Sequence, residues 1–194
     1  MKIQKKQRNL PILLISSLNI TAINDNIKKM NFQKDKIINF DNSFFILNRT
    51  KLKQGFKGFT NELHKQNPKL LQNNYFYLNI WAIICKPCID EIPFIDNLPE
   101  KFNKSLTCVM VSAYSNGAVN NFIKNKNVIM NNFTFINEMI DFISGIYNEI
   151  EVKSQSFPLH VILDKKGNCL AYLFGTIHDE NSAAPLINFI NSLE

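Results

Sequence analysis

The segment from Trp81 to Cys88 constrains the fold of this chain more than any other. It holds two cysteines, Cys85 and Cys88, two residues apart, with Pro87 directly before the second. An apolar run from Tyr75 to Ala82 leads in, and apolar residues at helical spacing follow. A strand that ends in Cys-x-Pro-Cys and opens a helix is the layout of a dithiol/disulfide redox site. Unpaired backbone N–H groups and the dipole at such a helix start favour negative charge on the first sulfur.

Size and charge limit the classes of protein to consider. The chain has 194 residues, 45% of them hydrophobic, which is enough for one domain with a core. Its formal net charge of +6 is modest and its lysines are scattered, so we expect no nucleic-acid partner. We expect a monomer with a leader over residues 1–22, an extension over 23–72 that packs on the domain, and a main domain over 73–194.

The first 22 residues have the order of a secretory signal. A basic cluster precedes a mostly apolar run from Leu10 to Ile20, and the small residues Thr21 and Ala22 follow. This order predicts export to the periplasm or cell envelope. Polar residues and Pro11 interrupt the apolar run, so the alternative is a basic leader before an edge strand, which would leave the protein in the cytoplasm.

Hydrophobic periodicity predicts alternating strands and helices. Before Tyr75 we expect a strand within 37–47 and a short helix carrying Phe56, Phe59 and Leu63. From Tyr75 onward we expect strands at 75–81, 106–113, 133–136, 159–163 and 169–174. We expect helices from Cys88 to about Phe102 and at 116–126, 138–147 and 184–193. Strands that alternate with helices before a hairpin and a last helix describe a mixed-sheet α/β domain.

This order resembles the thioredoxin superfamily, and more narrowly the TlpA/ResA-like branch of bacterial envelope thiol-disulfide oxidoreductases. The matching residues are Asn79-Ile80-Trp81-Ala82, Cys85, Cys88, Glu91, Pro93, Phe157-Pro158, Asp164 to Gly167 and Gly175. The resemblance covers about residues 70–194. It implies a thioredoxin fold, a central mixed β-sheet flanked by helices, with a strand and helix inserted before a cis proline at Pro158. The chain departs from the branch where Ile84 replaces a tryptophan and where Phe157 precedes the proline, and these departures bear on substrate and partner.

The resemblance also assigns roles to residues. Cys85 is expected to be the nucleophile, Cys88 the resolving thiol, and Glu91 a carboxylate that exchanges a proton with Cys88. Substrate contacts are expected from Trp81, Lys86, Phe157 and Pro158. The backbone of Phe157 would pair with an extended partner as an added strand.

Other interpretations of the polar and sulfur-bearing residues stay open beside these. The cysteine pair can be a static disulfide, although a staple that closes so small a loop contributes little stability. A closed zinc site needs four ligands. We place Cys108 in an outer strand and Cys169 in the strand at the opposite sheet edge, so both are expected to be buried hydrophobes and no metal or cofactor is expected. We expect His160 and His178 to be structural, with no base or nucleophile beside them, and Asn79 to be a satisfied buried amide.

The sequence therefore predicts a thiol-disulfide oxidoreductase that exchanges its dithiol with protein partners. The resemblance places it as a reductant in the cell envelope, supplied by an electron donor in the membrane. One alternative is a thioredoxin-fold binding module without catalysis. Another is a peroxide-reducing enzyme, but peroxiredoxins place Thr or Ser three residues before the reactive cysteine, where this chain has Ala82.

Overall fold

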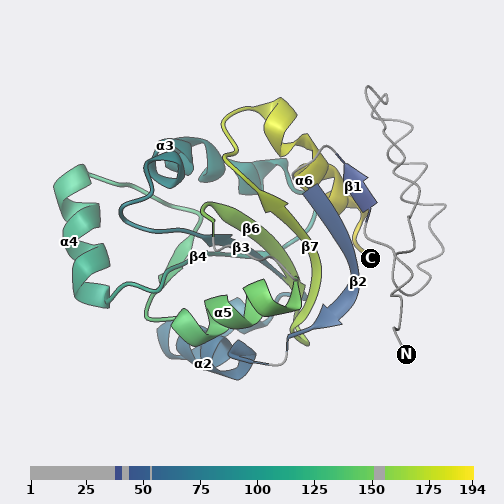
Figure 1. The fold of residues 1–194 in the computed structure, drawn as a ribbon, viewed down its shortest axis with the longest axis horizontal. Helices are drawn as coiled ribbons and strands as arrows, with labels where there is room; N and C mark the ends of the chain where they lie inside the picture. The colour runs from purple at the N-terminus through teal and green to yellow at the C-terminus, as the bar shows by residue number, and fades with distance from the viewer. Residues whose placement is uncertain (1–37, 41–43, 53, 151–155) are drawn as a thin grey trace, which may run out of the picture.

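The computed structural model describes residues 38–40, 44–52, 54–150 and 156–194. The expected leader over 1–22 and the first part of the expected extension lie outside these residues. Within them, seven strands form one sheet in the order β1-β2-β7-β6-β3-β4-β5 (Figure 1). The strands are β1 Ile38–Phe40, β2 Phe44–Lys51, β3 Tyr75–Ile80, β4 Thr107–Val111, β5 Thr134–Ile136, β6 Leu159–Asp164 and β7 Asn168–Phe174.

The sheet is mixed, as predicted. β3 pairs in parallel with β4, and β4 in parallel with β5. On the other side β3 pairs antiparallel with β6, β6 with β7, β7 with β2, and β2 with β1. Parallel neighbours need a crossover, and the chain supplies a helix after β3 and another after β4. The hairpin from β6 to β7 turns at Asp164, whose carboxylate accepts from the backbone N–H groups of Lys166 and Asn168.

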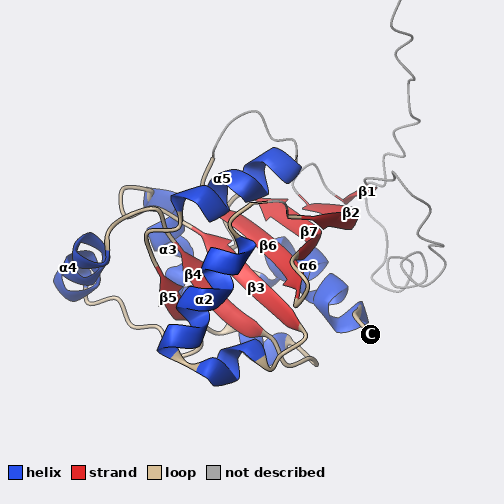
Figure 2. Cartoon of the chain, turned by 90° about the horizontal axis from the view of Figure 1, so that it is seen from below, coloured by secondary structure: helices blue, strands red, loops and turns tan. Residues whose placement is uncertain are grey.

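Helices cover both faces of the sheet. One face carries α3 (Lys86–Ile95), α4 (Asn116–Lys126) and α6 (Glu180–Ser192), and the other carries α2 (Phe56–Gln66) and α5 (Ile140–Glu149). Seen from below, α2 and α5 lie across the strands (Figure 2). The predicted fold class is confirmed, because a mixed sheet is flanked by helices and β5 with α5 forms the expected insertion before Pro158.

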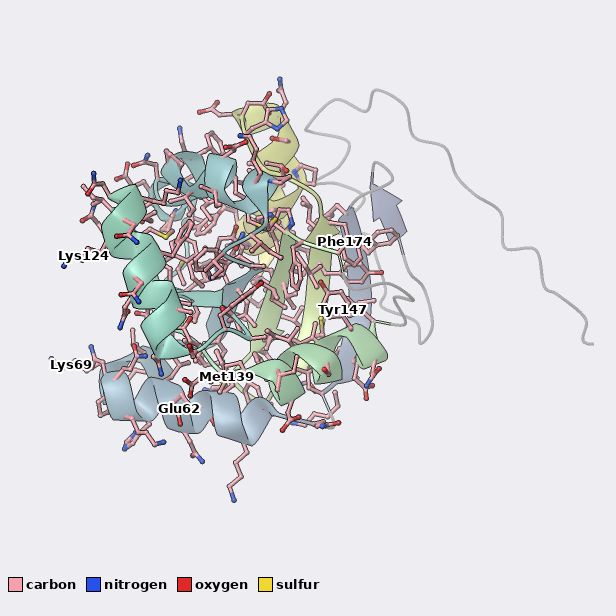
Figure 3. The ribbon with its side chains drawn as sticks, turned by 60° about the vertical axis from the view of Figure 1, so that its left-hand side comes forward. Glu62, Lys69, Lys124, Met139, Tyr147 and Phe174 are labelled. Atoms are coloured by element: carbon pink, nitrogen blue, oxygen red, sulfur yellow. A yellow bond between two sulfur atoms is a disulfide. The ribbon has the colours of Figure 1, made fainter. Side chains whose placement is uncertain are left out.

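The face under α2 and α5 is packed by aromatic rings. Phe59 of α2 stacks on Phe142 of α5 with ring centroids 4.5 Å apart. At the far end of α5, Tyr147 lies 6.4 Å from Phe174 of β7 between ring centroids, and both residues are labelled in Figure 3. Gly145 of α5 lets the backbone before α2 come close to this helix, because a Cβ there would lie 2.6 Å from the carbonyl oxygen of Gln54.

Among the helices, two boundaries differ from the predictions by more than two residues. The helix that begins at the cysteines ends at Ile95, and a separate 3₁₀ turn covers Leu98–Lys101, so the prediction of one helix to about Phe102 is wrong. Pro99 explains the break, since a proline disfavours helical backbone at the residue before it and offers no N–H. The last helix begins four residues earlier than predicted, at Glu180, because Asp179 and Ser182 form a reciprocal capping box.

The described part of residues 23–72 contributes to the same sheet and its cover. β2 pairs along β7, so β7 is an interior strand and the prediction that Cys169 lies in an edge strand is wrong. The predicted helix around Phe56, Phe59 and Leu63 is confirmed as α2, with Phe59 and Leu63 buried. None of the helices in the described part of the chain is long and apolar enough to cross a membrane.

Candidate functional site

A disulfide joins Cys85 and Cys88 at the start of α3. Cys85 is the N-cap residue, and its sulfur accepts the backbone N–H of Cys88 at 3.2 Å. Pro87 stands in the first turn, where its missing N–H costs no helical hydrogen bond. Cys85 is half-buried, whereas Cys88 is fully buried. The pair is therefore asymmetric, with one sulfur accessible at the helix tip and the other beneath it.

The loop that leads into the disulfide is held tightly to the sheet. Trp81 directly follows β3, and its backbone N–H donates to the carbonyl of Val111 on β4 at 3.1 Å. One turn later the N–H of Cys85 donates to the carbonyl of Ala82 at 3.0 Å. The first sulfur is thus fixed where β3 ends and α3 begins.

An apolar pocket of about 600 Å³ lies beside the accessible sulfur. Its lining residues come from the β3–α3 loop, the segment after β4 and the residue before Pro158: Trp81, Ala82, Ile84, Cys85, Ala113, Tyr114 and Phe157. Ile84 is 80% exposed and is the most exposed of the large hydrophobic residues in the described ranges. Trp81 reaches the pocket although it is almost wholly buried, with its ring packed on Phe122 and Phe135.

The predicted cis bond is confirmed between Phe157 and Pro158. Pro158 directly precedes β6, and its carbonyl accepts the N–H of Gly175 at 3.2 Å. Phe157 is partly buried, lines the pocket, and meets the ring of Tyr147 edge to face at 6.4 Å. The structure therefore brings Phe157 to the same pocket as Cys85, although 72 residues separate them in the sequence.

Lys86 points into solvent, as the sequence predicts. Its ammonium group lies 2.6 Å from a carboxylate oxygen of Asp90, with the two side chains 82% and 55% exposed. Asp90 therefore offsets part of the positive charge that Lys86 brings to the cysteine loop.

Glu91 is fully buried, one turn after Cys88 on the same face of α3. Its Oε1 accepts the side-chain N–H of Asn79 at 2.7 Å, and its Oε2 accepts the backbone N–H of Ile177 at 2.9 Å. Glu91 thus lies in the interior with Cys88, one turn away on the same helix, whereas its sequence neighbour Asp90 faces solvent.

The prediction that His160 has no base beside it is wrong. His160 lies on β6 and is fully buried, and its Nε2 is 3.4 Å from Oε2 of Glu91. Its Nδ1 is 2.9 Å from the hydroxyl of Tyr77 on β3. Alternation along β6 directs His160 toward α3, and the register places it opposite Asn79. The resulting cluster, Tyr77, Asn79, Glu91 and His160, is called the buried polar cluster below.

Two features of the buried polar cluster bear on its chemistry. The pKa of Tyr77 is raised well above its usual value, so this hydroxyl stays protonated. Burial is the largest cause, and interactions with Glu91 and with the Cys108 sulfur follow. Asn79 was expected to be a satisfied amide, but its Oδ1 is buried without a hydrogen-bond partner among the described residues. Such a group departs from the general rule that buried polar atoms are paired.

The other two cysteines stand apart from the pair. Cys108 on β4 and Cys169 on β7 are free thiols, and both are buried as predicted. They belong to the cores on opposite faces of the sheet. Within the described ranges, no group of three or more His, Cys, Asp or Glu side chains is arranged to hold a metal ion.

Comparison with protein-family models finds no match to this chain, and comparison with curated proteins finds none. Among solved structures the chain is similar to StoA from Bacillus subtilis, with 19% identity over 56% of this chain and 79% of that one, at a TM-score of 0.42. It is also similar to a putative thioredoxin from Neisseria meningitidis, with 20% identity over 64% and 80% of the two chains, at a TM-score of 0.44.

A third similar structure is a thiol-disulfide isomerase from Corynebacterium glutamicum, with 11% identity over 66% of this chain and 87% of that one, at a TM-score of 0.46. Likeness at these identities and TM-scores says nothing about what this chain does.

Proposed function

We propose that this chain is a thiol-disulfide oxidoreductase that exchanges the Cys85–Cys88 disulfide with the thiols of protein partners. The observation that carries the proposal is the asymmetry of the pair. Cys85 lies at the accessible N-cap of α3 and accepts a backbone N–H, and Cys88 is buried, with the buried carboxylate of Glu91 one turn further along the same helix. An accessible sulfur whose anion is stabilised by a helix start can attack a partner's disulfide or leave from one.

In the reducing direction the Cys85 thiolate attacks one sulfur of a partner disulfide. A mixed disulfide forms, and the other partner sulfur leaves as a thiolate. Cys88 then loses its proton to Glu91 and attacks the Cys85 sulfur, which releases the second partner thiolate and restores the Cys85–Cys88 disulfide. The partner gains two electrons and the protein dithiol loses two.

The partner would meet the apolar pocket as it meets the sulfur. Phe157, Trp81 and Ile84 line this pocket together with Cys85. Phe157 stands two residues before β6 begins, and there its backbone can pair with an extended segment as an added strand. Lys86 adds an exposed charge beside the loop, whereas Pro158 is buried and would act through the backbone of Phe157.

The test is a substitution pair with a matched control. Cys85→Ser should abolish reduction of a model protein disulfide, while Cys88→Ser should accumulate a stable mixed disulfide that non-reducing electrophoresis detects. Cys169→Ala is the control and should retain turnover, since its thiol is buried away from the loop. Full activity in the Cys85→Ser protein would contradict the proposal, and a binding module would keep its affinity for a partner in that variant.

We further propose that the protein acts as a reductant in the cell envelope and receives electrons from a donor in the membrane. The resemblance to the TlpA/ResA-like branch and the signal-like order of residues 1–22 support this placement. The reduction potential against glutathione tests the direction. A value below about −250 mV would agree with a reductant, and a value near about −120 mV would mark an oxidant. Fractionation of cells would show whether the protein lies in the envelope.

A further inference from the structure

The two carboxylate oxygens of Glu91 have unequal surroundings. Oε2 accepts the N–H of Ile177 at 2.9 Å and has Nε2 of His160 at 3.4 Å. Oε1 accepts one hydrogen bond, from the Asn79 amide at 2.7 Å. An oxygen that faces several donors is better stabilised as an acceptor, so a proton that reaches Glu91 is better placed on Oε1.

The neighbours of His160 fix which ring nitrogen carries its proton. Nε2 faces two acceptors, the carbonyl oxygen of Gly175 at 3.2 Å and Oε2 of Glu91 at 3.4 Å. Nδ1 faces the Asn79 amide nitrogen at 3.3 Å, which can only donate, and the Tyr77 hydroxyl at 2.9 Å. These contacts require a proton on Nε2 and a lone pair on Nδ1. His160 therefore presents a fixed donor to Oε2.

Asn79 can change its role toward Oε1, which His160 cannot do toward Oε2. Its amide nitrogen donates to Oε1, while its own Oδ1 has no partner among the described residues. If Oε1 gains a proton, a half-turn of the amide brings Oδ1 to face the new O–H group. That turn leaves one amide atom unpaired before and after, and it gives up the longer 3.3 Å contact between the amide nitrogen and Nδ1 of His160, which keeps the Tyr77 hydroxyl at 2.9 Å as its donor.

We propose that the side-chain amide of Asn79 turns from donor to acceptor when Glu91 gains a proton. We propose also that His160 is the positioning residue that directs this proton to Oε1. This inference rests on the proposed exchange function. In the resolving step the Cys88 proton moves to Oε1 of Glu91. The Asn79 amide turns so that its Oδ1 accepts a hydrogen bond from the new O–H group, and the Cys88 sulfur attacks the Cys85 sulfur. The bond from Cys85 to the partner sulfur breaks and its electron pair leaves with the partner thiolate.

The titratable groups around this step come from four elements. His160 faces Glu91 from β6, and Tyr77 from β3 reaches it through His160. On α3 the neighbour is Cys88 itself. Cys108 of β4 contributes to the raised pKa of Tyr77. No other charged side chain of the described residues is within 4.0 Å of the Glu91 carboxylate.

A two-phase reaction of the reduced protein with a chromogenic nitrobenzoate disulfide tests the proposal. The first release of thiolate reports attack by Cys85, and the second reports resolution by Cys88. Since a positioned proton acceptor contributes about 10²- to 10⁴-fold, Asn79→Leu and His160→Leu should each slow the second phase by about tenfold or more and leave the first unchanged. His160→Gln, whose amide can donate from the position of Nε2, should recover to within about twofold of wild type.

The pH profile separates this role from a merely structural one. In the wild-type protein the second phase should depend weakly on pH, because Glu91 takes the proton internally. In Asn79→Leu the rate of the second phase should rise by up to about tenfold per pH unit, because the Cys88 thiolate must then form by exchange with solvent.

Asn120→Leu and His178→Gln are the matched controls on exposed sites, and their rates should match those of the wild type. Asn79→Ala replaces Asn79→Leu if the bulkier variant does not fold.

The outcomes also separate this inference from the proposed function. If the wild-type protein releases no thiolate in either phase, the exchange function is wrong and the inference falls with it. If the wild type shows both phases and the second phase is unaffected by folded Asn79 and His160 variants, the exchange function stands and the inference alone is overturned.

Discussion

The four cysteines of this chain occupy two kinds of environment. Cys85 and Cys88 lie where β3 gives way to α3, at a helix start beside a pocket. Cys108 and Cys169 lie within strands, with burial as the main cause that raises the pKa of each thiol, for Cys108 to about 12. The two environments thus differ in backbone placement: the disulfide pair stands at a helix start, which favours negative charge on sulfur, and the two free thiols stand where burial disfavours that charge.

The strongest test of this contrast is the rate at which each thiol is alkylated. In the reduced protein at neutral pH we expect iodoacetamide to modify Cys85 at least about 10³-fold faster than Cys108 or Cys169, because a thiol with so high a pKa has very little thiolate. Mass spectrometry of digested samples over time gives the rates. Equal labelling of Cys85 and Cys108 would remove the basis of the comparison.

A second test removes the carboxylate of Glu91, which belongs to the environment of the disulfide pair and not to that of the two free thiols. Glu91→Gln should slow the resolving phase by about 10²-fold, because the amide cannot take the Cys88 proton, and should leave the attack by Cys85 unchanged. Rapid-mixing absorbance with the nitrobenzoate disulfide measures both phases. Asp90→Asn on the exposed side of the same helix is the matched control, and a comparable loss there would contradict the assignment to Glu91.

A third test concerns the packing thiols and alkaline pH. The pKa of Cys108 rises from 9.0 to about 12 on folding, with burial as the larger cause and Asp96 as the smaller one. Above about pH 9 the unfolded thiol ionises and the folded one does not, so the free energy of unfolding should fall as pH rises toward 12. Cys108→Ala should remove roughly 1 kcal/mol per pH unit of that fall.

Urea denaturation at a series of pH values measures this slope. Tyr77, whose pKa is also raised in the folded state, contributes to both slopes, and most of its contribution cancels in their difference because Cys108 is the smallest of the three causes of that raised pKa. Identical slopes in the two proteins would show that Cys108 does not stay protonated in the folded state.

The smallest expected effect comes from the charges on the cysteine loop. Lys86→Gln should make the reduction potential slightly more negative, because it removes a charge that favours the thiolate, and Asp90→Asn should shift it the opposite way. Since the two side chains are exposed and paired, each shift should stay below about 15 mV. Equilibration with glutathione measures the potential, and shifts of equal sign would contradict this account.

Local signals made much of the site predictable. The Cys-x-Pro-Cys spacing located the helix start, and the resemblance around Pro158 located the cis bond. Both depend on neighbours in sequence. The resemblance also predicts Phe157 as a substrate contact, although the pocket that Phe157 shares with Cys85 needed the structure.

The interior contacts were harder to predict, because they join residues that are distant in the sequence. Nothing near His160 in the sequence indicates that Glu91 lies 3.4 Å away, since α3 brings the carboxylate over β6. An alternation test on β6 would have placed His160 on the face toward α3 and raised this pairing as a candidate. The interior position of β7 was missed for a similar reason, because the pattern before Tyr75 does not reveal which strand β2 joins.

The outer strands have a consequence for solubility. Among the described strands, the two edges of the sheet are β1 and β5, and each is three residues long. At β5 the side chain of Gln66 also donates to the carbonyl of Phe135 at 2.8 Å. Edges this short give an unrelated chain few backbone groups on which to assemble a continuous intermolecular sheet. The architecture thereby lowers the tendency of the protein to aggregate through its own strands.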